Sequence, residues 1–392
     1  MSTCDRSSRG RGPWARLVRS IFATSLFAVF CALPAFAAGD PRGFLGDDDI
    51  GVPLRVRDYT FPSFLVLGFA PMPSAPLGRG NYAFEFHGSV INDFQASDAV
   101  ENYLAQTRGD GVRRALDQQD VEAILSLPEG QAFYIDAEYD AADFAFFYGL
   151  ADNLDVGLAV TALHYTTGRL DDSIFDFHQD VGYGQQGRDY VLDNHFQVVF
   201  GGGGKLPPLV TLDGSGVSGI GDPSLFLRYA FRSRSNGWQY GLTLGVKPPV
   251  ADTTRFLSTG SWDYGLQLVG DRRFENSALI VNLSAVKAGT FEQNGFDPPV
   301  LPALHLSYIY RFRRMPRTRV MLQALVAEHP FRDLVDSELT ELETQLSLAM
   351  KWNTPLGVFG LGLTENLFNM DNTPDIGLHL SWGLLVKRDD QP

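Results

Sequence analysis

The stretch ELTELETQLSLAMKW, residues 338–352, decides the fold. Apolar residues recur at alternate positions in it: Leu342, Leu346, Leu348, Met350 and Trp352. The intervening positions are polar or charged: Glu341, Glu343, Gln345, Ser347 and Lys351. Successive side chains of a β-strand point to opposite faces, so this stretch predicts a long strand with one apolar face and one wet face.

The same alternation recurs along the chain, for example in residues 238–247, 262–271 and 304–312. These strands approach the roughly ten residues that cross a bilayer at a tilt, whereas strands of soluble proteins average about five or six. Trp and Tyr lie near the strand ends, as an interfacial girdle requires. Short turns also alternate with long loops. We therefore predict an all-β fold, an antiparallel transmembrane β-barrel with an N-terminal extension and structured outer loops.

We expect about twelve spanning strands, and an even number places both barrel ends in the periplasm. The strands begin near Gly80, Gln131, Leu154, Gly219, Gly237, Trp262, Ser277, Pro302, Thr318, Glu338, Leu356 and Asp375. Residues 59–69 are a candidate for a further strand. Residues 195–213 form either a hairpin inside the largest loop or two additional strands, which would give about fourteen. Helical periodicity marks 99–106, 117–126 and 173–180 within the long loops.

The chain begins with a targeting signal followed by three further segments. Five Arg residues precede an apolar run at 21–33, and Ala35-Phe36-Ala37 fits a signal-peptidase site. The alternatives are an N-terminal membrane anchor and a lipoprotein, which bulky Phe30 before Cys31 disfavours. We assign 1–37 to a signal peptide, 38–79 to a periplasmic or lumen-entering segment, 80–386 to the barrel and 387–392 to a tail. Residues 375–382 are similar to the C-terminal strand that the barrel-insertion machinery recognises.

Charge and cysteine content exclude several classes of site. Both cysteines, Cys4 and Cys31, lie in the predicted signal peptide, so the mature chain has neither disulfides nor cysteine metal ligands. Removal of residues 1–37 takes away five Arg and one Asp, and the net charge falls from −14 to −18. A chain this acidic is a poor nucleic-acid binder, and we expect outer-membrane lipids and a small solute as its partners.

Three sequence blocks resemble one known family. They are Gly168-Arg169-Leu170-Asp171-Asp172-Ser173-Ile174-Phe175-Asp176-Phe177-His178 followed by Gly187-Arg188-Asp189, then Pro53-Leu54-Arg55-Val56-Arg57-Asp58, and Ile135-Asp136-Ala137-Glu138. Together they resemble an uncharacterised proteobacterial outer-membrane family that carries only a domain-of-unknown-function label. The resemblance implies location and fold, and it brings neither a substrate nor a catalytic residue.

A His-x-Ser pair occurs three times, at 87–89, 305–307 and 379–381. Some outer-membrane lipid hydrolases resemble this arrangement, with a His base and a Ser nucleophile on one strand face. Here each pair falls on the polar face, away from lipid, so we favour polar filling of the lumen over catalysis. Gly201–Lys205 lacks the Ser or Thr of a phosphate loop. An acidic cluster at 171–180 is better explained as a solvated loop than as a Ca²⁺ site. We expect no cofactor and no metal.

The polar strand face supplies the remaining candidates. Inward-facing charges are expected at Glu85, Arg228, Arg232, Lys247, Asp263, Asp271, Arg311, Glu341, Glu343 and Lys351. They either line a wet channel or form a salt-bridged filling. Apolar residues in the loop 168–194 predict that it folds inward as a gate, with candidates at Asp171, Ile174, Phe177, His178 and Arg188. The favoured function is a non-enzymatic channel or transport protein. The alternatives are a lipid hydrolase and a filled structural or surface-interaction barrel.

Overall fold

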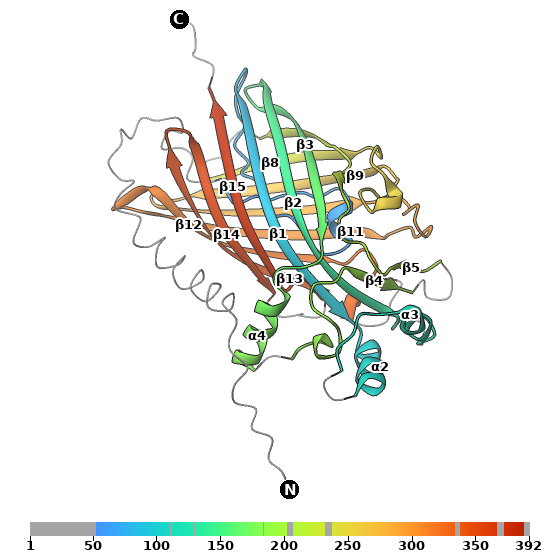
Figure 1. Ribbon diagram of the computed structural model, residues 1–392. Helices are drawn as coiled ribbons and strands as arrows, with labels where there is room; N and C mark the ends of the chain where they lie inside the picture. Colours follow the sequence, from blue (N-terminus) through green and yellow to red (C-terminus); the bar gives the residue numbers. More distant parts are fainter. Residues whose placement is uncertain are drawn as a thin grey trace, which may run out of the picture.

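Twelve antiparallel strands close into a barrel in the computed structural model (Figure 1). The structure describes residues 52–109, 112–128, 130–182, 184–201, 207–231, 237–333, 338–366 and 372–387. The predicted signal peptide, residues 1–37, lies outside the described residues, and so does the end of the predicted tail. The strand number expected from the alternation is confirmed.

The barrel strands follow one another in chain order around the wall. They are β1 (Tyr82–Ala96), β2 (Phe133–Ala151), β3 (Leu154–Thr166), β7 (Ser224–Ala230), β8 (Trp238–Lys247), β9 (Asp263–Arg273), β10 (Ser277–Lys287), β11 (Val300–Phe312), β12 (Met315–Glu328), β13 (Leu342–Thr354), β14 (Gly357–Asn366) and β15 (Ile376–Val386). Closure comes from β1, which pairs with both β2 and β15. Both ends of the barrel chain therefore lie at the end with the short turns, which we call the short-turn end.

Three short strands extend the wall at the opposite, long-loop end. The hairpin β4 (Gln197–Phe200) and β5 (Leu209–Thr211) pairs with the first residues of β2, and β6 (Ser218–Ile220) pairs with β3. Residues 195–213 thus contribute a hairpin inside the largest loop and no spanning strands. Residues 59–69 contain only the 3-10 turn η2 (Ser63–Leu65), so the proposed additional strand there was wrong.

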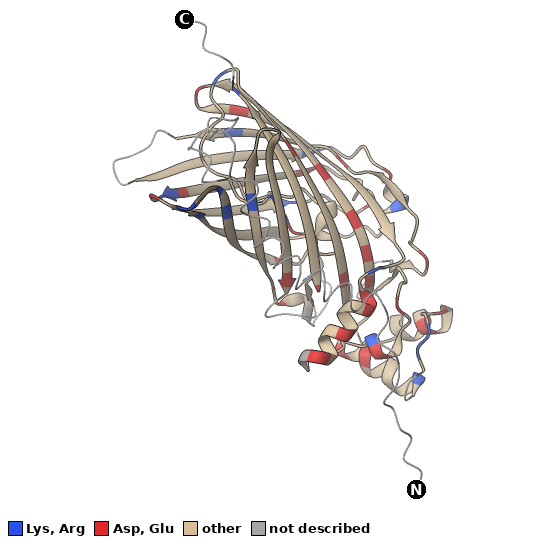
Figure 2. Ribbon diagram, turned by 60° about the vertical axis from the view of Figure 1, so that its left-hand side comes forward, with Lys and Arg blue, Asp and Glu red and all other residues tan. Residues whose placement is uncertain are grey.

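Three helices gather at the long-loop end, where acidic residues are concentrated (Figure 2). They are α2 (Asp98–Arg108), α3 (Gln118–Leu125) and α4 (Asp171–Val181), which confirms the three helical segments. Ser97 caps α2 by accepting from the Val100 amide, and Asp117 caps α3 in a capping box. Among the described residues, no helix has both the length and the apolar character to span a membrane.

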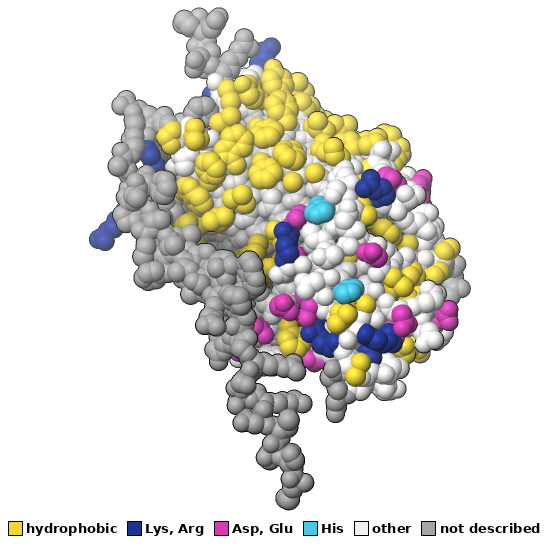
Figure 3. Space-filling view, viewed as in Figure 1, with side chains coloured by type: hydrophobic (Ala, Val, Ile, Leu, Met, Phe, Trp, Pro, Cys, Tyr) yellow, Lys and Arg dark blue, Asp and Glu magenta, His cyan; other side chains and the backbone are white. Residues whose placement is uncertain are grey.

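The barrel wall presents an apolar face outward and a polar face inward. Hydrophobic side chains cover the outer surface towards the short-turn end, and polar and charged side chains cover the long-loop end (Figure 3). Leu380 is 49% exposed, whereas Glu343 and His379 are at most 4% exposed. A band of this kind is the surface that acyl chains solvate, so lipid accounts for the strict alternation of these strands.

The lumen contains the first residues that the structure describes. Residues 52–79, which we call the plug segment, form an irregular hairpin. Its first arm starts near the short-turn end, where Pro53 O accepts from Lys351 Nζ at 2.7 Å. It turns at the long-loop end, near Thr60, and its second arm returns to Leu77, whose amide donates to Asp155 of β3. The segment leads directly into β1.

Candidate functional site

Inward-facing side chains of the wall hold the backbone of the plug segment. Asp263 accepts from Leu67 N at 2.8 Å, Asn282 from Met72 N at 2.8 Å, and Asp271 from Ser74 N at 2.7 Å. On the first arm, Gln323 Nε2 donates to Leu54 O at 3.1 Å. A segment without regular structure has to satisfy its buried amides and carbonyls elsewhere, and here polar wall residues do so.

Glycines in the wall make room for apolar side chains of the plug segment. A Cβ on Gly265 would lie 2.6 Å from Phe69 Cε2, and one on Gly245 would lie 2.8 Å from Phe69 Cζ. On the opposite arm, a Cβ on Gly362 would lie 2.5 Å from Leu54 Cδ2. These distances are far below van der Waals contact, so the plug segment fits the wall only because these positions lack side chains.

An aromatic cluster packs inside the lumen at the turn of the plug segment. Tyr59, Phe61 and Phe64 from the plug segment pack with Tyr139 of β2 and Tyr165 of β3, and all five are at most 3% exposed. The rings of Phe64 and Tyr139 have centroids 4.5 Å apart, and the Tyr139 hydroxyl donates to the Tyr59 carbonyl. We call these five residues the aromatic seal. It lies inside the barrel between the turn of the plug segment and the strands β2 and β3.

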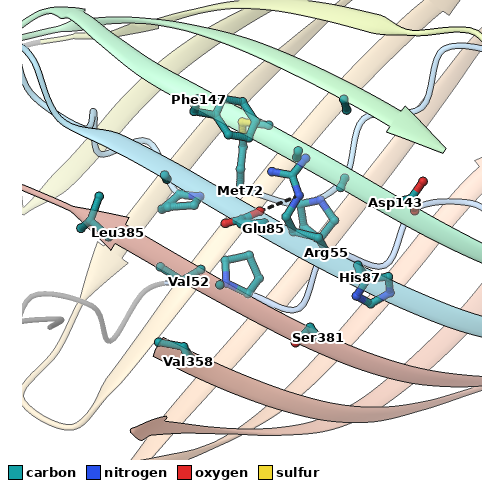
Figure 4. A pocket seen from close by; sticks show the side chains of 18 of the residues that line it. Val52, Arg55, Met72, Glu85, His87, Asp143, Phe147, Val358, Ser381 and Leu385 are labelled. Carbon is teal, nitrogen blue, oxygen red and sulfur yellow. Dashed lines mark ion pairs between the residues drawn. The ribbon is translucent and has the colours of Figure 1, made fainter. Parts of the chain in front are cut away.

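A pocket of about 610 Å³ lies beside the aromatic seal. Figure 4 shows His87, Asp143 and Ser381 at one end of this pocket and Leu385 at the other. Lys387 and Arg273, at the ends of strands, also line it, so the pocket extends to the rim of the short-turn end. Its volume is in the range of small-molecule sites.

Most of the predicted inward-facing charges bind the plug segment or another charge. Glu85 pairs with Arg55 at 2.9 Å, and Arg228 pairs with Asp155 at 3.7 Å while donating to Pro73 O. The remaining contacts follow the same pattern: Lys247 pairs with Asp222 at 2.8 Å and with Asp263 at 3.2 Å, and Glu343 accepts from Thr60 Oγ1 at 3.1 Å. In this conformation these charges pair with one another or hold the plug segment, and the pocket lies beside them.

Three members of the predicted set are not part of this lumen. Glu341 is exposed in the loop before β13, and Arg311 lies at the short-turn rim, where it donates to Glu275 O at 3.4 Å. Arg232 lies outside the described residues. The alternation placed Glu341 and Arg311 on the polar face of their strands. It does not show at which residue a strand extends beyond the barrel interior.

The loop at 168–194 is fixed to the rim of the barrel by a buried ion network. Arg188, 3% exposed, donates to Asp171 at 3.0 Å and to Asn92 at 2.8 Å, and it also pairs with Asp375. Burial opposes the charged guanidinium, but the carboxylates of Asp375 and Asp171 outweigh it and raise the pKa of Arg188. Arg188, predicted as a gate candidate, thus makes buried ion pairs that hold the loop at the rim.

Three of the four predicted gate candidates on α4 are buried against the barrel end, and the fourth is exposed. Asp171, Ile174 and His178 are buried, which is the i, i+3, i+7 face of α4. Burial also lowers the pKa of His178 below its usual value. Phe177 is 50% exposed, so its predicted contact with the wall was wrong. Asp171, rather than Phe177, lies on the buried face of α4, because Arg188 supplies the opposite charge.

The His-x-Ser motifs form no pair within a strand among the described residues. Instead, Ser89 Oγ lies 2.9 Å from His379 Nδ1 on the neighbouring strand, and Thr364 Oγ1 lies 2.8 Å from His379 Nε2. No group of three potential ligands that could hold a metal occurs within the described part of the chain. Most of the Gly201–Lys205 stretch lies outside the described residues.

Residues 112–384 match the model of a family described as "Protein of unknown function (DUF3187)". This chain belongs to the DUF3187 family. The matched residues are more than half of the chain and include the loop motif at 168–178, whereas the plug segment precedes them. No protein with a curated description matches the chain.

Several solved structures are similar to this DUF3187 chain in overall fold. The COG4313 outer membrane channel from Pseudomonas putida F1 is 12% identical, with a TM-score of 0.47, over 81% of this chain and 100% of that one. The P. putida toluene transporter TodX is 9% identical, with a TM-score of 0.36, over 80% of this chain and 91% of that one. The monoaromatic hydrocarbon channel CymD is 10% identical, with a TM-score of 0.36, over 79% and 90%.

Proposed function

We propose that this chain is a non-enzymatic outer-membrane channel for small solutes, in which the plug segment closes the lumen. The short-turn end faces the periplasm, because barrels of this class keep their short turns there. The observation that carries the proposal is the hairpin of residues 52–79 in the lumen. A barrel whose own inward side chains filled it would need no separate segment there.

The contacts of the plug segment support a role as a closure that can be displaced. Its backbone is held by individual side-chain hydrogen bonds, at Asp263, Asn282 and Asp271, and it adds no strand to the barrel. Each such bond contributes only about 0.5–1.5 kcal/mol net, or somewhat more to a carboxylate, so the set can be exchanged for water step by step. The wall itself keeps its closed ladder when the segment leaves.

The test compares the mature chain with a variant lacking residues 53–77, both reconstituted into planar bilayers. The proposal expects a clear rise in single-channel conductance on deletion, because the hairpin and three rings of the aromatic seal are removed. A control deletes residues 172–186 from the outer loop and leaves the lumen occupied. A deleted barrel that inserts and folds but conducts no more than the mature chain would favour the filled structural barrel.

A further inference from the structure

The inner end of the pocket contains buried polar atoms without a hydrogen-bond partner. His87 is 3% exposed and Ser381 is 7% exposed, and they face each other across the β1–β15 pairing. Both ring nitrogens of His87 and the Ser381 hydroxyl have no partner in the described structure. Leaving such groups unsatisfied costs roughly 1–3 kcal/mol each, so a ligand that bonds to them gains that amount back.

The charge of the pocket lining is opposite to that of the protein. Basic side chains line it at Arg55, Arg57, Arg228, Arg273, Lys351 and Lys387. The acidic lining residues are Glu85 and Asp143, and Asp155 and Asp271 lie behind the lining next to Arg228 and Arg273. Basic groups still outnumber acidic ones when all four are counted, although the whole chain carries −14.

The positive charges act on the same end of the pocket as the unpaired atoms. Arg55, Arg57 and Lys351 line the pocket together with His87, and Arg55 and Arg57 also pair with Glu85 at 2.9 Å and Asp143 at 3.6 Å. A cationic environment in a site of low dielectric favours an anion over a neutral or positive group. Neutral His87 has one N–H to donate and Ser381 has its hydroxyl, so the two can donate together to one carboxylate.

The rest of the lining suits an apolar body. Phe86, Phe147, Phe226, Met72 and Trp382 contribute aromatic and thioether surface. Phe147 lies near two guanidinium groups, with Arg55 and Arg228 at 5.1 and 5.2 Å from its ring centroid. Figure 4 shows Phe147 and Met72 between the polar end and the rim.

We infer that this pocket binds small organic carboxylates, with the carboxylate at His87 and Ser381 and the apolar body against Phe147 and its neighbours. The inference rests on the proposed function, since it names the solute class of that channel. It predicts a preference that apolar filling alone would not give: the anion binds better than an alcohol or an amine with the same body.

Calorimetric titration of the purified mature protein in a neutral detergent tests this preference. The probes are 3-phenylpropionate, 3-phenylpropan-1-ol and 3-phenylpropylamine, which share one body. We expect the carboxylate to bind at least about tenfold tighter than the alcohol, as a charge-assisted hydrogen bond implies. Equal affinity for all three probes, or no binding of the carboxylate, would overturn the inference.

Two variants identify the site, and a third serves as a control. His87→Phe keeps an aromatic ring beside Tyr59 and His379 but removes both nitrogens, and Ser381→Ala removes the hydroxyl. Each should weaken 3-phenylpropionate binding about tenfold. His305→Phe is the matched control, because His305 is also a buried histidine without hydrogen bonds but lies outside the pocket lining.

The outcomes separate this inference from the proposed function. Unchanged affinity in both His87→Phe and Ser381→Ala would overturn the site, whether or not deletion of 53–77 raises conductance. Loss of affinity in both variants with no rise in conductance would refute the channel and leave the carboxylate site standing. Heat-modifiable migration on gels shows that each variant barrel is folded before titration.

Discussion

At the scale of single residues, the fit of the plug segment depends on positions where the wall has no side chain. Gly265 faces the lumen beside Phe69, whereas Gly270 on the same strand lies beside Tyr240 and Trp238, where a Cβ would find ordinary contacts of 3.6 Å or more. An added methyl group at Gly265 therefore collides with the plug segment and lies 3.0 Å from Val286 Cγ2 of the neighbouring strand, whereas one at Gly270 meets neither.

Gly265→Ala should loosen the second arm of the plug segment. Overpacking of this kind costs about 1–3 kcal/mol, and the arm can relieve it by moving away from the wall. Hydrogen exchange of the amides of residues 66–72 should accelerate in Gly265→Ala and stay at the parent rate in Gly270→Ala. Identical exchange in both variants would show that Phe69 is not held at this position.

Arg188 is the second residue on which much depends. Arg188→Gln leaves Asp171 and Asp375 buried without their cation, and breaking a buried pair costs about 3–5 kcal/mol. Opening of α4, measured by hydrogen exchange, should become easier by an amount of this order. Arg169→Gln is the control in the same loop: this side chain is 54% exposed, so its loss should cost about 0–1 kcal/mol. Equal effects would mean that the network does not hold the loop.

At the scale of elements, the strands could be predicted from the sequence, whereas the segment before them was expected to be either periplasmic or lumen-entering and its path could not be predicted. Lipid imposes an apolar side chain at every second position, so the outward and inward faces of strands such as β9 and β13 can be recognised from the sequence. The plug segment has no periodicity, because its successive residues contact different strands of the wall. Its contacts join residues such as Leu67 and Asp263, or Met72 and Asn282, about 200 positions apart.

The outer loop shows the same limit in another form. The amphipathic pattern located α4 and the burial of Ile174, but it treated Asp171 as a residue in water and Phe177 as a residue in the interior. Both assignments reverse once Arg188, 17 positions along the chain, neutralises Asp171. A pattern within one helix carries no information about a partner outside it. The pocket was missed for the same reason, since His87 and Ser381 meet only after closure.

The loop therefore gives a different prediction from the one its composition suggests. Removal of 172–186 should leave conductance at the level of the mature chain, because the aromatic seal and the plug segment close the lumen independently of α4. Single-channel recording of this deletion beside the mature protein measures the effect. A large rise in conductance would restore the gate that the sequence predicted.

At the scale of the whole molecule, the barrel separates two requirements. The outer surface needs only an apolar band, because lipid stabilises outward-facing apolar side chains along every strand. The inner surface has to hold a segment without regular structure, so it combines acceptors for backbone amides with glycines that leave room for apolar side chains. In the proposed function, the position of residues 52–79 therefore decides whether the lumen conducts.

A reversible lock on the plug segment tests this claim most directly. A Cβ on Gly241 would lie 3.5 Å from Ser74 Cβ, a spacing that suits a disulfide, and the predicted mature chain contains no other cysteine. The mature Ser74→Cys/Gly241→Cys protein should not conduct in planar bilayers when oxidised. It should conduct after reduction. The conductance of each single-cysteine variant should not change when the reductant is added. Equal conductance of the oxidised and reduced double variant, with the disulfide confirmed by mass, would contradict the account.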